Sequence, residues 1–529
     1  ALSLRIPRGE DIAMTHRRRR LFALVTTAAL VLAAASPGAA QGPVKRGGTL
    51  ILARQGEATN LDPHKVPAFT SHRVFELVYS TLTRLGPDLS VQPDLAESWT
   101  IAPDGRQITL RLRAAKFHNG DPLTSADVKF TYERILNAQT KAVARAFFGD
   151  VDRIEAPDPR TVVLHLKQPN VALLTYMAHP NASVVSEKVA RAAGDDLSRK
   201  EHAIGTGPFR LAEWVPDNVM RFEAFRDFYV QGQPYLDGVR INIIPDEAGL
   251  TAALRTRAAD LALIADARVA QTLGREAGVT VSAKPSLNYH LLFLNTKRKP
   301  LDNPKVRQAI ASAIDRKQII DTVALGAGDP AGPIPPALPF YALPTTEYPL
   351  YGRDVARAKR LLQEAGVGPV QLTILTQTTE PVYAKDVAQI VQQQLGEAGI
   401  KVNIELLEFG QWVQRWLKAD FDMAPGLNSG QPDPDFYLFR YFTSDGNLNF
   451  VHSYQNDTAS DAIKRARTLT DAQKRKELYA TAQRELVNGV PFVWLYVGRD
   501  YVGLQPSTKG FVHLPNGSIL YLRQTWLDK

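Results

Sequence analysis

Four segments of the chain alternate between apolar and polar residues, which is the pattern of a strand with one face buried. They are residues 49–53, 108–112, 162–166 and 239–243. Longer stretches with apolar residues at helical spacing separate them. The sequence therefore predicts an α/β protein.

One stretch predicts a complete strand–helix–strand unit. Residues 370–375 have strand character, and apolar residues between 387 and 398 recur at helical spacing up to Gly399. Residues 400–406 then alternate as a second strand. Two strands joined through one helix pair in parallel, through a right-handed crossover.

Two helix starts are marked by local chemistry. Asn303 followed by Pro304 is a cap residue with a proline in the first turn. Thr124 and Asp127 have the spacing of a capping box, which satisfies free amides at a helix start. We therefore expect helices beginning at residues 304 and 125.

A proline-rich segment lies between the helix expected at residue 304 and the strand–helix–strand unit at residues 370–406. Residues 329–349 contain seven prolines, which excludes a continuous helix or strand. The segment is either a stiff surface loop or a loop at the rim of a binding cleft.

Composition narrows the class of protein. The chain has 529 residues, of which 44% are hydrophobic and 22% charged, enough for more than one core. It has no cysteine, which excludes disulfides, thiolate metal sites and a lipidated N-terminal cysteine. The net charge is +9, about +5 without the first forty residues, and the basic residues are scattered. Nucleic-acid binding is therefore not expected.

The first forty residues have the pattern of an export signal. Arg17 to Arg20 are followed by an apolar run from Leu21 to Ala35, which is too short to span a bilayer. Small residues end at Ala40, where we expect cleavage, with Met14 as the biological start. The Sec route is favoured over the twin-arginine route, and the mature protein is expected in the periplasm, beginning at Gln41.

The chain is poor in catalytic motifs. It has no His-Glu-x-x-His helix, no Gly-x-Ser-x-Gly elbow and no Gly-x-x-x-x-Gly-Lys loop. Its ten histidines are dispersed, without metal-ligand spacing. We expect no enzyme, no cofactor and no metal; an exported hydrolase remains the alternative from another class.

Five motifs in order resemble the family 5 solute-binding proteins, the dipeptide, oligopeptide and nickel receptors of ABC importers. The most particular is the stretch from Leu95 to Val128, with Pro103 to Gly105 as a turn. The others are Leu61 to Pro63, Gly205 to Phe209, Asn295 to Ala309, and Pro432 to Asp435.

The resemblance implies a two-lobed periplasmic-binding-protein fold of type II-like topology, with an extra domain inserted in the first lobe. Lobe I would comprise residues 41–84, 205–282 and 492–529, the inserted domain 85–204, and lobe II 283–491. The partners implied are a small or short-peptide ligand and an inner-membrane permease with its ATPase subunits. A monomer is expected.

Three candidate ligand-binding residues come from this resemblance. Glu57 matches a glutamate that faces the cleft, and a solvated surface carboxylate is the alternative. Trp412 matches a cleft aromatic, although Trp416 one turn later also fits a core stripe. Tyr289 would present its hydroxyl to the cleft, unless it is packed as an ordinary strand residue.

The run from Asn428 to Asp435 supplies the others: Asn428, Gly430 and Asp433. Gly430 stands where peptide-binding relatives have an aspartate that pairs with the free amino group of the peptide. A buried ammonium without an anion is costly. Either Asp433 or Glu57 replaces that aspartate, or the ligand lacks a free amino terminus; Asp433 and Asp435 are equally suited to forming a turn.

The sequence thus predicts an exported receptor that captures a peptide or peptide-like solute by lobe closure. A non-peptide polar solute is the second interpretation, and a sensory or chaperone-like binder a third.

Overall fold

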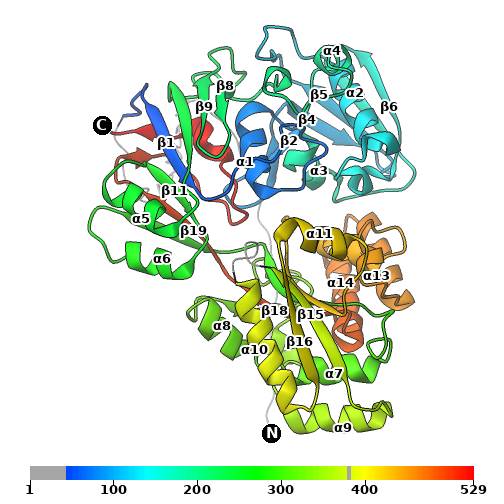
Figure 1. The fold of residues 1–529 in the computed structure, drawn as a ribbon. Helices are drawn as coiled ribbons and strands as arrows, with labels where there is room; N and C mark the ends of the chain where they lie inside the picture. Colours follow the sequence, from blue (N-terminus) through cyan, green and yellow to red (C-terminus); the bar gives the residue numbers. More distant parts are fainter. Residues whose placement is uncertain (1–42, 378–382) are drawn as a thin grey trace, which may run out of the picture. The chain divides into compact units, whose positions relative to one another are not determined.

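The computed structural model describes residues 43–377 and 383–529. The expected signal segment, residues 1–40, lies outside the described residues. Residues 44–529 form one compact unit, whose strands belong to three main sheets (Figure 1). No helix in the described part of the chain combines the length and apolarity needed to cross a membrane.

The first sheet has seven strands and gathers segments from both ends of the chain. In spatial order they are β12 (Thr280–Pro285), β19 (Arg499–Leu504), β11 (Leu261–Ile264), β1 (Thr49–Arg54), β10 (Gly238–Ile243), β9 (Val219–Ala224) and β8 (Phe209–Val215). β1 runs parallel to both of its neighbours, β10 and β11. Three helices belong to this region: α1 (Phe69–Val78), α5 (Glu247–Arg255) and α6 (Ala267–Leu273).

The second sheet has six strands, formed by the middle of the chain. In spatial order they are β14 (Asp329–Pro330), β18 (Phe492–Val497), β13 (Tyr289–Leu294), β17 (Met423–Asn428), β15 (Gln371–Gln377) and β16 (Lys401–Leu407). Its helices are α7 (Pro304–Ala313), α8 (Arg316–Val323), α9 (Val355–Ala365), α10 (Ala384–Glu397), α11 (Phe409–Leu417), α12 (Pro434–Phe442), α13 (Asp457–Thr468) and α14 (Ala472–Gly489).

The third sheet, of four antiparallel strands, lies in residues 85–204, the range expected for an inserted domain. It consists of β4 (Ala96–Ile101), β5 (Gln107–Leu112), β7 (Thr161–Leu166) and β6 (Val151–Asp158). Its helices are α2 (Ser125–Leu136), α3 (Leu173–Tyr176) and α4 (Glu187–Ala192). We call residues 85–204 the inserted segment.

Two short two-stranded sheets complete the fold. β2 (Thr83–Leu85) pairs with β3 (Val91–Pro93), and β20 (Thr508–Lys509) pairs with β21 (Trp526–Leu527).

The local predictions hold. Asp127 accepts a hydrogen bond from the backbone amide of Thr124 at 3.0 Å, within the capping box that begins α2. The side chain of Asn303 caps α7, with a proline in the first turn. β15, α10 and β16 form the expected parallel strand–helix–strand unit. All four alternating segments are strands.

Two regions differ from the expectation. β18 begins at Phe492, where lobe I was expected to resume, yet it pairs with β13 in the second sheet. All six residues of β18 are buried, and a continuous apolar run carries no information about which sheet it joins. The proline-rich segment is not only a surface loop, because Ala331 and Ile334 are buried in the main core.

Candidate functional site

The chain passes between the two larger sheets at two adjacent connections. Residues 286–288 lead from β12 into β13, and Gly498 leads from β18 into β19. The amide of Ser286 donates to the carbonyl of Gly498 at 3.1 Å, so the two connections are hydrogen-bonded to each other. A few residues in such connections can absorb the dihedral changes of a hinge.

Two of the predicted residues meet directly beside these connections. Tyr289 begins β13 and faces Asn428, the last residue of β17, across the ladder. The side-chain amide of Asn428 donates to the Tyr289 hydroxyl at 2.8 Å. Both residues are buried, and burial raises the pKa of Tyr289, so its hydroxyl remains protonated near neutral pH. The pair is packed as a strand contact.

Gly430 follows closely and is held against the same connection. Its amide donates to the Asn288 side chain at 3.0 Å. A Cβ atom here would lie 2.1 Å from the Leu287 carbonyl oxygen and 2.0 Å from the Tyr437 hydroxyl oxygen. The aspartate that the resemblance led us to expect here would therefore overlap both the Leu287 backbone and the Tyr437 side chain.

Asp433 is already paired. It caps α12 by accepting from the amide of Asp435, and both of its carboxylate oxygens lie 3.0 Å from one guanidinium nitrogen of Arg475. Both side chains are almost fully buried. The N-cap role agrees with the turn-forming interpretation. Because Arg475 already pairs with the carboxylate of Asp433, that carboxylate is not free to pair with an amine of the ligand.

Glu57 lies in the segment that follows β1 of the first sheet. It accepts hydrogen bonds from the indole nitrogen of Trp214 at 2.5 Å and from the amide of Asp217 at 3.0 Å. The carboxylate therefore joins the segment after β1 to the β8–β9 hairpin and is not a freely solvated surface group.

Trp412 is packed inside the second sheet region. Its indole nitrogen donates to the Leu375 carbonyl at 3.1 Å, and its ring stacks on those of Phe409 and Trp416. Only 7% of the residue is exposed. Trp412 therefore packs against Trp416, the residue for which a core stripe was expected.

The structure also shows a group that the sequence did not indicate, where the inserted segment contacts α12 and α13. The Tyr176 hydroxyl of α3 donates to the buried Asp435 of α12. Arg467 of α13 lies between Asp435, at 3.6 Å, and Asp150 of the inserted segment, at 3.3 Å. We call Asp150, Tyr176, Asp435 and Arg467 the polar contact.

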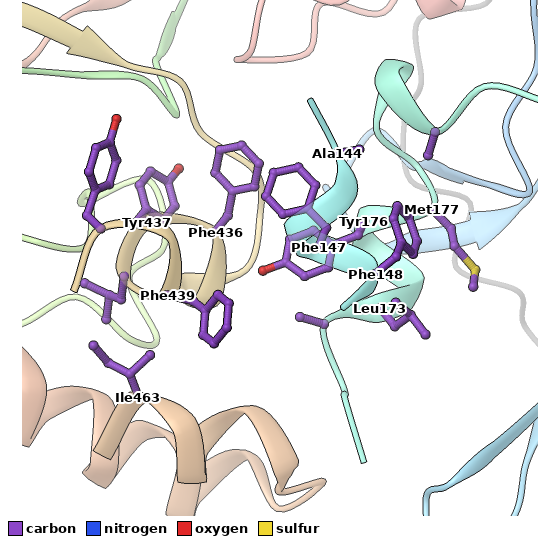
Figure 2. Packing of buried hydrophobic residues seen from close by; sticks show 14 of the residues in the cluster. Ala144, Phe147, Phe148, Leu173, Tyr176, Met177, Phe436, Tyr437, Phe439 and Ile463 are labelled. Carbon is purple, nitrogen blue, oxygen red and sulfur yellow. The ribbon is translucent and has the colours of Figure 1, made fainter. Parts of the chain in front are cut away.

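Aromatic rings pack around the polar contact. Figure 2 shows Phe147 and Tyr176 of the inserted segment facing Phe436 of α12. The ring centroids of Phe147 and Phe436 are 5.2 Å apart, and Phe147 stacks on Tyr176 at 4.6 Å. Burial raises the pKa of Asp435, although Arg467 beside it favours the charged form. This contact joins the inserted segment to α12 and α13 of the second sheet region.

Two buried carboxyl groups elsewhere in the molecule have raised pKa values. Burial raises the pKa of Asp500, the second residue of β19, to about 7, and that of Glu76 in α1 also to about 7. The Ser286 hydroxyl donates to Asp500 at 3.1 Å. Ser518 and the amide of Ile519 donate to Glu76 at 2.6 and 2.8 Å.

The sequence provided little indication of the residues that form the polar contact. The run from Pro432 to Asp435 did mark the start of α12. Nothing local, however, connects Asp435 with Arg467, 32 positions later, or with Tyr176, 259 positions earlier. In the described residues no three histidine, cysteine or acidic side chains are grouped as a metal site.

The sequence and the fold of this chain are similar to those of known proteins. The model for "Bacterial extracellular solute-binding proteins, family 5 Middle" matches residues 90–449. A glutathione-binding protein, GsiB from Pectobacterium atrosepticum, is 29% identical over 95% of this chain and 97% of its own length.

Two solved structures have the same fold. AgaA from A. tumefaciens R10, in complex with agropinic acid, is 28% identical with a TM-score of 0.83, covering 91% of this chain and 99% of its own. DppA from Helicobacter pylori, in complex with the peptide STSA, is 26% identical with a TM-score of 0.82, covering 92% and 99%.

Proposed function

We propose that this chain, which belongs to the family 5 bacterial extracellular solute-binding proteins, captures a peptide or peptide-like solute by closing its two lobes over it. Membership makes it a solute-binding protein of an ABC transporter, in a family that is not enzymatic. The resemblance and the α/β periplasmic-binding-protein fold expected from the sequence are confirmed.

The pair of hinge connections carries the proposal. The chain crosses between the two lobes at residues 286–288 and 498, about which the lobes can rotate, and Tyr289, Asn428 and Gly430 lie beside these connections. A solute bound there would contact both lobes. Its binding free energy would shift the equilibrium toward the closed form, since a ligand favours the state that it binds more tightly.

The ligand class follows from the relatives and from the occupied carboxylates. GsiB is named for glutathione, and DppA was solved with a peptide. Gly430 cannot offer a charge, while Asp433 and Glu57 are engaged with Arg475 and Trp214. A peptide-like solute whose affinity does not depend on a free α-amino group fits this arrangement. An opine-like acid is the second candidate, favoured by the likeness to AgaA.

Calorimetry tests the proposal. The purified protein is titrated with glutathione, with tripeptides that have free or acetylated N-termini, and with agropinic acid. We expect binding of at least one peptide-like probe, with little change on acetylation. Tight binding of free peptides that acetylation abolishes would show that a carboxylate anchors the amine. Binding of agropinic acid alone would favour the second candidate.

Delivery completes the proposed function. The chain would be exported by its cleavable signal, beginning at Gln41 in the periplasm, and would act as a monomer that presents the closed form to a permease and its ATPase subunits. N-terminal sequencing of the exported protein checks the cleavage site.

A further inference from the structure

Three arginines lie on α12, α13 and α14, and two of them have acidic partners. Arg467 lies between Asp150 and Asp435, and Arg475 pairs with Asp433. Arg440 of α12 is different, because within residues 43–377 and 383–529 it has no carboxylate partner and no side-chain hydrogen bond. Its Nε atom is buried without a hydrogen-bond partner.

Aromatic rings hold the Arg440 side chain in place. Its guanidinium carbon lies 4.8 Å from the ring centroid of Phe436, 5.6 Å from Phe147 and 5.7 Å from Tyr441. Ring faces attract a cation, but they do not neutralise it as a carboxylate does. The guanidinium of Arg440 is half-buried, and its N–H groups can still donate two parallel hydrogen bonds to a planar acceptor such as a carboxylate.

The position of Arg440 connects the two parts of the candidate site. On one side it contacts Phe147 of the inserted segment, and its charge helps to lower the pKa of His179, after burial and His72. On the other side it contacts Tyr441, whose hydroxyl is 3.5 Å from the Asn428 side chain. Arg440 thus lies between the inserted segment and the hinge-side pair of Tyr289 and Asn428.

We propose that Arg440 is the anchor for a carboxylate group of the captured solute. The inference rests on the proposed function and deepens it, because it requires the solute to be an acid. A guanidinium binds a carboxylate through two parallel hydrogen bonds, which would fix the acid end of the solute between the two lobes. The neighbouring Asp433 and Asp435 do not compete, since Arg475 and Arg467 already pair with them.

The test compares acids with their amides. Glutathione and a tripeptide are titrated by calorimetry, each with its free C-terminal carboxylate and as the C-terminal amide, into the unaltered protein, Arg440→Met and Arg440→Lys. Methionine keeps the contact with the rings but has no charge. Lysine keeps the charge but cannot donate two parallel hydrogen bonds as a guanidinium does. Arg415→Met is the control, because Arg415 of α11 has its own partners, Glu405 at 2.6 Å and Asp420 at 2.9 Å.

We expect the acid to bind about ten-fold or more tightly than the amide, the size of one charge-assisted hydrogen bond. Arg440→Met should remove this preference, Arg440→Lys should retain part of it, and Arg415→Met should leave it unchanged. Equal binding of acid and amide by the unaltered protein would overturn the inference, as would a preference that survives in Arg440→Met.

Failure of the proposed function has a different signature. If neither acid nor amide peptides bind, the peptide assignment fails, and the role of Arg440 is decided with agropinic acid by thermal shift. Stabilisation of the unaltered protein but not of Arg440→Met supports the anchor; stabilisation of neither or of both refutes it. The melting temperature of each free variant shows whether it is folded.

Discussion

At the scale of the residue, the structure explains why position 430 is a glycine and not the aspartate expected from the family resemblance. The sequence showed that an expected aspartate was missing, but not why. In the structure a β-carbon would overlap the Leu287 carbonyl and the Tyr437 hydroxyl, which themselves form a hydrogen bond of 2.7 Å. The replacement of the aspartate is therefore tied to how the hinge connection packs.

This packing predicts that Gly430→Ala destabilises the protein. Overpacking against backbone costs about 1–3 kcal/mol, and Gly430→Asp should cost more because it also buries a carboxylate. Gly396→Ala in α10 is the matched control: its β-carbon would meet no atom within 4 Å, so stability should stay the same or rise by up to about 1 kcal/mol. Urea unfolding measures both; an unchanged Gly430→Ala would contradict the packing argument.

A second prediction at this scale concerns Glu76 and pH. Because its pKa in the folded protein is raised from 4.5 to about 7, the folded state holds the proton more tightly than the unfolded state. Stability is then lost as pH rises from about 4.5 to about 7. Glu76→Gln does not titrate, so its unfolding free energy relative to the unaltered protein should increase with pH across this window.

Denaturant unfolding at several pH values between 4.5 and 8 measures that difference. Asp500→Asn should show the same sign, since the pKa of Asp500 is also raised to about 7. A difference that does not vary with pH would show that the carboxyl group of Glu76 titrates normally.

At the scale of the element, the sequence predicted local features well and long-range partners poorly. The capping box of α2, the proline start of α7 and the β15–α10–β16 unit depend on neighbours within a few residues. The sheet to which β18 belongs, and the partners of Asp433 and Asp435, depend on tertiary packing. For Trp412, Glu57 and Asp433 the sequence supplied positions, but their contacts with Leu375, Trp214 and Arg475 came only from the structure.

The polar contact between α3, α12 and α13 predicts an effect on ligand affinity. Tyr176→Phe removes a hydroxyl that donates to the buried Asp435, a bond to a charged acceptor worth about 1.5–3 kcal/mol. If this contact stabilises the closed form, the affinity for the solute should fall by about ten-fold or more. Calorimetry with the best-binding probe measures the change.

Tyr132→Phe is the matched control for that variant. Tyr132 of α2 also lies in the inserted segment and is fully buried, but its hydroxyl has no hydrogen-bond partner among the described residues. Its removal should leave affinity unchanged and stability equal or slightly higher. Equal losses of affinity in the two variants would mean that the effect is one of general packing and not of the contact with Asp435.

At the scale of the whole molecule, the hinge and the polar contact together predict a measurable closure. Binding should decrease the radius of gyration in solution scattering, because the two lobes approach each other over the solute. Since the chain has no cysteine, single cysteines for fluorescent labels can be placed on the inserted segment at Arg153 and on α13 at Asp461, where 59% and 65% of the side chains are exposed. Energy transfer between the labels should rise on addition of the solute.

Tyr176→Phe connects this motion to its proposed cause. In this variant the solute should still produce closure at saturation, but at a higher concentration, because the closed form has lost one of its stabilising bonds while the hinge is unchanged. Tyr132→Phe should close at the same concentration as the unaltered protein. If saturating solute changes neither the scattering nor the energy transfer of the unaltered protein, the two connections at residues 286–288 and 498 are not a hinge, and the solute is bound by a rigid receptor.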